Sequence, residues 1–282
     1  MSLPGSGHLG PVLIAKRISA AGRRGSSRPL VVETEAGTRI VKLRGAAQGP
    51  APLVAEIIVA ALADAIGLAV PPRSLVELPA GIETAEWDDE LADLLDASVG
   101  VNLGFDFLAG AREFAIGDVD RVPPETRAAI LWLDRLVCNP DRTASNPNLL
   151  WWADQLWLID HGAALGFQYA WSRVSEETPR EPALMPDAHL FEGVVSSDEL
   201  QAADAALADR LTRDVLDTAV AGVPDTFLAP LAEADAQPVG RRRAAYASFL
   251  WKRLKPPRPF LETRASPLAR PQRKRPAWLI GR

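Results

Sequence analysis

Residues 139–162, the most informative stretch of this chain, read NPDRTASNPNLLWWADQLWLIDHG. The stretch begins like a loop, because Asn, Asp, Pro and Ser favour turns. Two short apolar runs follow at 149–152 and 156–159, and the turn between them predicts a small β-hairpin. Such a hairpin folds back on itself, so we expect the loop before it and the residues after it on one side of a cleft.

Three residues of this stretch have the chemistry of a phosphate-transferring site. Asp141 and Asn146 lie in the loop, and Asp160 follows the second strand. In phosphoryl transfer one carboxylate orients and deprotonates the attacking hydroxyl, while an amide oxygen and a second carboxylate hold magnesium on the phosphates. We therefore expect Asp141 to be the catalytic base and Asn146 and Asp160 to be metal ligands. Gly162 is expected to let the backbone turn sharply beside the metal.

A capped turn is the structural alternative for Asp141 and Asn146, since each residue alone is common in loops. Asp160 is harder to explain in this way. It ends the apolar run Leu-Trp-Leu-Ile, where an ionised carboxylate is costly without a partner or a cation.

The N-terminal part supplies a lysine and a glutamate in the order that a kinase uses them. Lys42 lies on the second strand of a predicted hairpin. Glu56 follows on a helix predicted over 52–66, whose apolar residues recur with helical spacing and which Gly67 ends. We expect Lys42 to pair with Glu56 and to contact phosphates. The alternatives are a solvent-facing lysine and an ordinary salt bridge.

A Gly/Ser-rich loop over 22–27 precedes Lys42. Its residues Gly25, Ser26 and Ser27 offer backbone N–H groups and hydroxyls that would cover phosphates. Plain hairpin turns have the same composition. The phosphate-binding role is therefore favoured only by the position of the loop upstream of Lys42.

The pattern along the chain predicts an α+β fold with two lobes, because strands and one main helix come first and a helix-rich part follows. We expect a flexible N-terminus over 1–9, an N-lobe over 10–80, a C-lobe over 81–255 and a basic, Pro/Arg-rich tail over 256–282. The predicted strands of the first part are 11–18, 30–34, 39–43, 74–78 and 101–108. The further predicted helices are 86–97, 125–137, 196–220 and 241–254.

Composition excludes several classes of protein. Cys138 is the single cysteine and there are three histidines, which excludes a disulfide framework, a Cys-rich zinc site and a His-zinc hydrolase. A bound metal should therefore be oxygen-ligated, such as magnesium. No apolar run reaches the ~18 residues of a membrane span, and the first residues do not resemble a secretory signal. We expect a cytoplasmic protein without a membrane partner.

The charge is unevenly distributed. The 282 residues include 31 Lys and Arg against 36 Asp and Glu, a net charge of −5. Residues 241–282 hold 13 basic residues and one acid, a net of +12, which leaves 18 basic and 35 acidic residues, a net of −17, in 1–240. The two parts are expected either to dock on each other or to present the basic end to an anionic partner. We do not expect nucleic acid there, since no recognised binding pattern is present.

Taken in order, several segments resemble the HipA-like kinase domain, a group similar to the HipA toxin kinases and, more distantly, to the phosphatidylinositol kinases. The resemblance covers roughly residues 10–255 and is most specific over 141–162. The segments are GSSRP (25–29), VKL (41–43), AEIIVAALA (55–63), NPDRTASNPNLLW (139–151) and LWLIDHGAAL (156–165).

This resemblance implies a two-lobed, protein-kinase-like fold that binds ATP and Mg²⁺ and phosphorylates Ser or Thr of a protein. Asp141 would be the base, and Lys42 would contact the phosphates. The loop reads Asn-Pro-Asp rather than His-Arg-Asp, so we expect no arginine switch on an activation loop. The toxin kinases carry an extra N-terminal subdomain for which no room exists before residue 10, so neither a toxin role nor an antitoxin partner is expected.

Three alternatives stay open. A small-molecule kinase would share every ATP-side residue and differ only in its acceptor. A nucleotide-binding pseudokinase would keep the fold without transfer. A nucleic-acid-binding module would use the basic C-terminal end and would bind with a steep dependence on salt.

Overall fold

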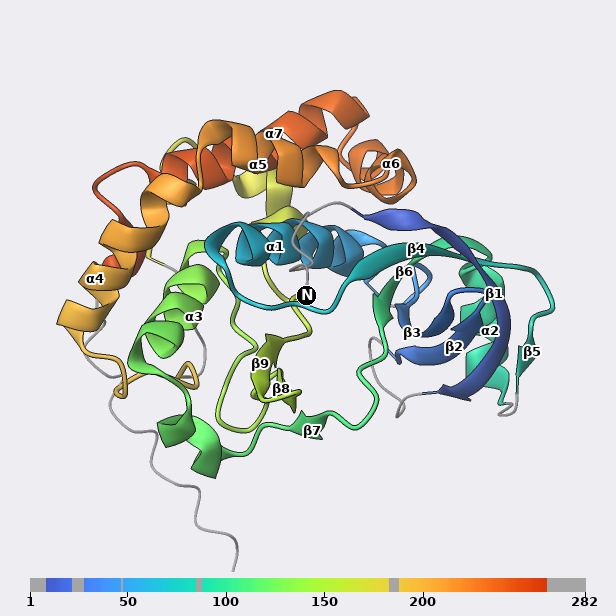
Figure 1. Ribbon diagram of the computed structural model, residues 1–282. Helices are drawn as coiled ribbons and strands as arrows, with labels where there is room; N and C mark the ends of the chain where they lie inside the picture. Colours follow the sequence, from blue (N-terminus) through green and yellow to red (C-terminus); the bar gives the residue numbers. More distant parts are fainter. Residues whose placement is uncertain (1–8, 22–27, 47, 85–87, 183–187, 263–282) are drawn as a thin grey trace, which may run out of the picture.

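The computed structural model describes residues 9–21, 28–46, 48–84, 88–182 and 188–262 (Figure 1). A β-rich N-terminal region precedes a helical C-terminal region, which confirms the predicted mixture of helices and strands. The predicted strands and most of the predicted helices are present, with their ends shifted by a few residues.

Six strands of the N-terminal region form one strongly bent sheet in the order β2-β3-β6-β4-β1-β5. The first part of β1 runs parallel to β4, and its second part runs antiparallel to β2. Register shifts along β1 let it bend between these partners. Strands β1, β2, β3, β6 and β4 thereby form a closed ring. The strands are β1 (Gly10–Ala21), β2 (Leu30–Thr34), β3 (Gly37–Lys42), β4 (Arg73–Leu78), β5 (Glu83–Thr84) and β6 (Gly100–Asp106).

The sheet continues past residue 80, where the sequence analysis ends the N-lobe. Strand β6 lies between β3 and β4, so the chain returns to the middle of the sheet. Before it, helix α2 (Asp89–Ala97) buries Leu91 and Leu95 in one apolar cluster with side chains of the sheet. The β-rich region therefore extends to Asp106.

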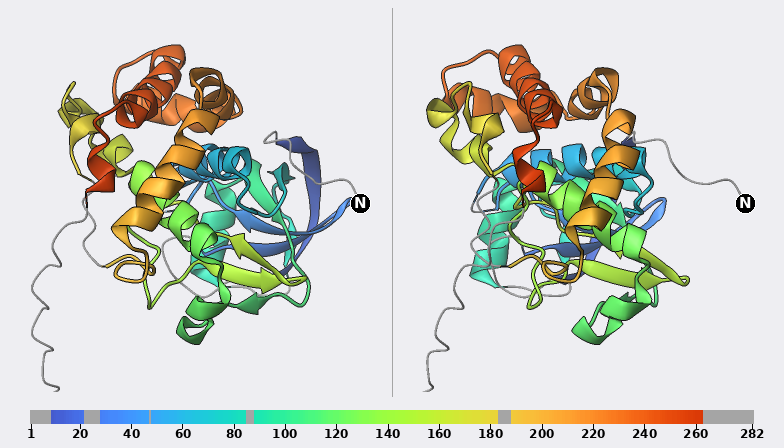
Figure 2. Two further views of the ribbon diagram at one scale, coloured as in Figure 1. Left: turned by 60° about the vertical axis from the view of Figure 1, so that its left-hand side comes forward. Right: turned by 90° about the vertical axis from the view of Figure 1, so that its left-hand side faces the viewer.

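Helix α1 (Ala51–Ile66) lies between the sheet and the C-terminal helices in the views of Figures 1 and 2. The helical spacing predicts one apolar face, but the structure buries nearly the whole circumference, Glu56 included. One core contains α1 together with Leu103 of β6 and Leu216 of the helical region. A helix packed from both sides needs apolar residues all round. Gly67, with φ 88°, ends the helix as predicted.

A small second sheet lies within the C-terminal region. Strands β8 (Leu149–Trp152) and β9 (Gln155–Leu158) form the predicted hairpin, and β7 (Arg112–Glu113) pairs with β8. Among the described helices none is long and apolar enough to cross a membrane alone, and α5 and α6, which would suffice together, are bent by 93°. The helices are η1 (Ile116–Arg121), α3 (Pro124–Leu136), η2 (Gly166–Arg173), η3 (Thr178–Arg180), α4 (Ser197–Leu207), η4 (Ala208–Arg210), α5 (Arg213–Ala221), α6 (Asp225–Ala234), α7 (Val239–Leu254) and η5 (Pro259–Leu261).

The prediction of one helix over 196–220 is wrong. Its start is confirmed, because Ser196 and Glu199 form the expected capping box. The helix then breaks, and α4, η4 and α5 follow one another. Thr212 caps α5 by accepting a hydrogen bond from the N–H of Val215. A second cap inside a continuous apolar pattern therefore divides the helix.

The last described residues pack on the helical region instead of forming the start of a tail. Phe260 is 2% exposed, and its ring meets the ring of Trp132 edge-on at 5.8 Å between centroids. Arg258 donates to Asp204 Oδ2 at 2.5 Å. The packed structure thus continues to residue 262, beyond the predicted limit at 255.

Candidate active site

A cleft of about 250 Å³ lies where β3, the first turn of α1 and the two loops beside the hairpin meet. Three of the predicted site residues, Lys42, Asp141 and Asp160, line it together. Lys42 comes from a segment far from the stretch 139–162 that holds Asp141 and Asp160, and the fold brings all three to one hollow. The other lining residues are Leu43, Ala46, Gln48, Gly49, Pro52, Leu53, Gly162 and Ala163.

Lys42, at the end of β3, is paired with two carboxylates. Its Nζ donates to Glu56 Oε1 and, at 2.6 Å, to Asp160 Oδ1. Burial by itself would lower the pKa of Lys42, but the two carboxylates outweigh burial and raise the pKa above its ordinary value. Burial would likewise raise the pKa of Glu56, whereas Lys42 and His161 hold it well below its usual range. The cleft therefore keeps a charged ammonium and a charged carboxylate side by side.

His161 supports Glu56 from the other side. The imidazole is fully buried, and its Nδ1 lies 3.3 Å from Glu56 Oε2. One oxygen of Glu56 thus contacts Lys42 and the other contacts His161. Because His161 directly follows Asp160, one turn of chain both lines the cleft and anchors the glutamate that holds Lys42.

The turn beside Asp160 differs from the prediction in the role of its glycine. Asp160 itself, and not Gly162, has the left-handed backbone conformation, with φ 56°. A Cβ atom added at Gly162 would lie 3.1 Å from Cβ of Pro52, which is closer than neighbouring side chains normally pack. Gly162 therefore allows the first turn of α1 to approach this segment closely, which keeps Glu56 within reach of the cleft.

The amide that reaches the Asp141 carboxylate belongs to Asn148, whereas Asn146 is the amide that the sequence predicts as a magnesium ligand. Asn148 Nδ2 donates to Asp141 Oδ2 at 3.2 Å. Asn146 is exposed, and its Nδ2 donates to the main-chain oxygen of Asp141 at 3.3 Å. The sequence did contain a signal for Asn148, since it is the last polar residue before β8, where the chain turns back toward the cleft.

The sequence matches a known family over residues 15–180, which is more than half of the chain; the family is described as HipA-like kinase. The chain belongs to the HipA-like kinase family. Among solved structures it is similar to the crystal structure of the Helicobacter pylori proinflammatory kinase CtkA, with a TM-score of 0.47 and 12% sequence identity. That similarity covers 84% of this chain and 98% of that chain. No curated protein matches this chain.

The loop that is predicted from the sequence to cover phosphates cannot be compared with the structure of this HipA-like kinase. The predicted loop residues lie outside the described residues: Gly25, Ser26 and Ser27. A segment that the sequence analysis does not single out lines the cleft through Ala46, Gln48 and Gly49, between β3 and α1. Gly49 has φ 62°, a conformation that suits glycine, so the chain turns here at the edge of the cleft.

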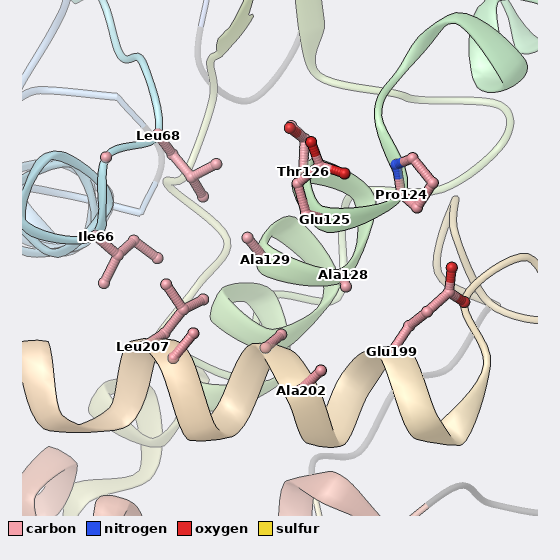
Figure 3. A pocket seen from close by; sticks show the side chains of 13 residues that line it. Ile66, Leu68, Pro124, Glu125, Thr126, Ala128, Ala129, Glu199, Ala202 and Leu207 are labelled. Atoms are coloured by element: carbon pink, nitrogen blue, oxygen red, sulfur yellow. The ribbon is translucent and has the colours of Figure 1, made fainter.

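A larger hollow of about 500 Å³ lies between the end of α1, the start of α3 and α4. Figure 3 shows the apolar side chains Ile66, Leu68 and Leu207 at one end and the carboxylates of Glu125 and Glu199 toward the other. Glu199 already accepts hydrogen bonds from Ser196 in the capping box. Of the predicted site residues that the structure describes, none lines this hollow, so its size alone does not make it the active site of the kinase.

Proposed function

We propose that this protein is an ATP- and Mg²⁺-dependent kinase that transfers the γ-phosphate to a Ser or Thr hydroxyl of a protein. The observation that carries the proposal is the cleft in which Lys42, Asp141 and Asp160 converge. Phosphoryl transfer depends mainly on positioning and on charge neutralisation, and a cation between carboxylates supplies both. Membership of the HipA-like kinase family supports transfer, and the resemblance to the HipA toxin kinases supports a protein acceptor.

Each residue has a separate task in this proposal. Glu56 holds Lys42 in the cleft, where the ammonium neutralises phosphate oxygens. Asp141 accepts the proton of the attacking hydroxyl. Asn148 orients the Asp141 carboxylate by donating to its Oδ2.

The donor set fits magnesium that arrives with the nucleotide. Among the described residues no group of three or more His, Cys, Asp or Glu side chains could hold a metal ion by itself. Magnesium in kinases takes one or two protein oxygens and completes its shell with phosphate oxygens and water. The Asp160 carboxylate and the Asn148 amide oxygen would be the protein ligands, with the sequence-predicted Asn146 as the rival amide. When bound, the ion would neutralise charge on the phosphates.

Transfer from γ-labelled ATP tests the proposal. Asp141→Ala should lower transfer to protein by about 100-fold or more, because a positioned base contributes about that much. Binding of a fluorescent ATP analogue should stay within about twofold, because the Asp141 carboxylate acts on the acceptor side. Ser145→Ala is the matched control, since Ser145 is exposed in the same loop; it should transfer normally.

The outcomes separate the alternatives. A labelled protein band that disappears in Asp141→Ala supports a protein kinase. Consumption of ATP only after a small-molecule extract is added would show that the acceptor is a metabolite and not a protein. Nucleotide binding without transfer in wild type would identify a pseudokinase, and normal turnover by Asp141→Ala would remove Asp141 from the mechanism.

A further inference from the structure

A buried carboxylate outside the cleft connects to the loop that carries Asp141. Asp134, on α3, is fully buried. Its Oδ1 accepts a hydrogen bond from Asn139 Nδ2 at 2.7 Å. Its Oδ2 accepts one from Arg142 Nε at 2.6 Å and lies 3.0 Å from His189 Nε2. Two side chains of the loop after α3 and one from a distant segment thus meet on one carboxylate.

Arg142 carries this contact to the far end of the catalytic loop. Its side chain is 0% exposed, like that of Asp134. While Nε contacts Asp134, Nη1 donates to the main-chain oxygen of Asn148 at 2.5 Å and to that of Pro147 at 3.3 Å. Arg142 directly follows Asp141 in the chain, and its guanidinium binds both Asp134 on α3 and the backbone of Asn148. The side chain therefore connects α3 to both ends of the loop.

His189 brings in a segment that lies after Asp160 in the chain. The N–H of Phe191 donates to His189 Nδ1 at 3.1 Å, so Nδ1 is the acceptor and Nε2 carries the proton donated to Asp134. The N–H of Leu190 also donates to the main-chain oxygen of Arg142 at 2.9 Å. An antiparallel bridge pairs Thr143 with His189. Side chains and backbone together fasten this segment to the loop.

The charges of this network need a reason beyond stability. Burying an ion pair costs about as much as its attraction returns, and an apolar replacement of similar volume is often as stable. A guanidinium with several directed donors does something that apolar packing cannot do, because it sets the distance between separate backbone segments.

We propose that Asp134 is a positioning residue, which through Arg142 and His189 holds Asp141 and Asn148 in register with the segment 189–191. The carboxylate does not touch the cleft, and it acts by fixing the loop between α3 and β8. This inference rests on the proposed function, because the loop is catalytic only if Asp141 is the base of a kinase. The geometry of the loop can nevertheless be measured without activity.

Two substitutions at one site give the sharpest test. His189→Ala removes the donor to Asp134, whereas the amide of His189→Gln can restore it. We expect His189→Ala to lower kcat about tenfold with the KM for ATP within about twofold, because supporting residues of a site contribute about 10-fold to 100-fold. His189→Gln should recover most of kcat. Asp134→Asn, which keeps the shape of the side chain, should lower kcat as His189→Ala does.

Asp204→Asn is the matched control. Asp204 is also a buried aspartate that contacts α3, since it accepts from Trp132 Nε1 at 2.8 Å and from Arg258. Its partners lie away from the catalytic loop. The variant should lose thermal stability as Asp134→Asn does but keep kcat.

Amide hydrogen exchange, read by mass spectrometry, supplies the measurement that needs no acceptor. Residues 141–148 should exchange faster in His189→Ala and Asp134→Asn than in wild type, and not in Asp204→Asn. Unchanged exchange of this loop in both variants overturns the inference, whether or not the protein transfers phosphate. Wild-type protein that binds no nucleotide and transfers none would instead defeat the proposed function alone. If the wild type is active and Asp204→Asn loses as much kcat as His189→Ala, the network around Asp134 contributes only to the stability of the fold and does not position the loop.

Discussion

At the scale of single residues, the site uses backbone conformations that most side chains avoid. Asn148 and Asp160 have φ of 50° and 56° and stand at the two ends of the hairpin. This left-handed conformation costs on the order of 1 kcal/mol for most residues, and Asn and Asp tolerate it best. The two residues that turn the chain at the hairpin ends are therefore also residues whose oxygens are suited to a metal.

Asn148 and Asn146 form a natural pair for testing this point. Asn148→Ala should lower kcat by about tenfold or more, because it removes the amide beside Asp141 and places alanine in a strained conformation. Asn146→Ala should stay within about twofold, since that side chain is exposed. Steady-state transfer at several magnesium concentrations measures both. A larger loss of kcat in Asn146→Ala than in Asn148→Ala would favour Asn146, the residue predicted from the sequence, as the magnesium ligand.

At the scale of elements, α1 is the structural centre of the molecule. It supplies Glu56 to the cleft and joins one core with β6 and the C-terminal helices. Lys42 reaches the cleft from the sheet, and Asp141 reaches it from the helical region. A change in the packing of α1 therefore affects the distance between these two groups.

Ile58 tests the role of α1 in stability. Ile58→Ala should lower the free energy of unfolding by about 3 kcal/mol, because Ile58 is fully buried in the shared core. Ile116→Ala is the control, since Ile116 is 58% exposed, and it should change stability by less than about 0.5 kcal/mol. Denaturant unfolding followed by fluorescence and by circular dichroism measures both. Two separate transitions, or a small loss at Ile58, would contradict a core shared through α1.

Elements with strong local signals are the ones that the sequence predicts well. The hairpin of β8 and β9, helix α3 and helix α1 appear close to their expected ends, since turn residues and apolar spacing mark them. Helix α6 has no counterpart among the predictions, and it contains Pro230, a residue that usually argues against a helix. The break before α5 was missed because the apolar spacing continues across Thr212.

At the scale of the whole molecule, part of the charge asymmetry is resolved inside the fold. Arg243 and Arg258 donate to Asp225 and Asp204. Arg253 is buried and donates to main-chain oxygens of the helical region, including that of Leu136 at 2.8 Å. Arg243 and Arg258 therefore dock on acidic residues, which is the first of the two alternatives for the basic end. The basic residues from 264 onward lie outside the described residues.

Acid stability is a property of the whole molecule that buried carboxylates control. Burial would raise the pKa of Asp134, but Arg142 and His189 outweigh it and hold the pKa well below its usual range. A carboxyl group of this kind contributes stability above its unfolded-state pKa of about 4, and this stability is lost as pH falls toward the lower folded-state value. The free energy of unfolding should therefore decrease steadily below about pH 4.

Asp134→Asn should remove part of that dependence. At neutral pH the variant should be less stable by about 3 kcal/mol, because Arg142 is left as a buried charge without its partner. Between about pH 4 and pH 2 its stability should fall less steeply than that of wild type, since asparagine does not titrate. Urea unfolding at a series of pH values measures both quantities. Parallel pH profiles would show that Asp134 is not a carboxylate with a lowered pKa.

The mixed α+β class of the fold, the hairpin and the pairing of Lys42 with Glu56 could all be predicted from the sequence, and the roles of Asp141 and Asp160 stay predictions. These follow from local periodicity, turn residues and the cost of an isolated charge, all of which neighbouring residues reveal. The folded chain was needed to show that Asn148 reaches Asp141, that α1 is buried nearly all round, and that Asp134, Arg142 and His189 meet. These contacts depend on the path of the loop after α3 and on which distant segments pack against it and against α1, and the spacing of residues along a chain does not contain that information.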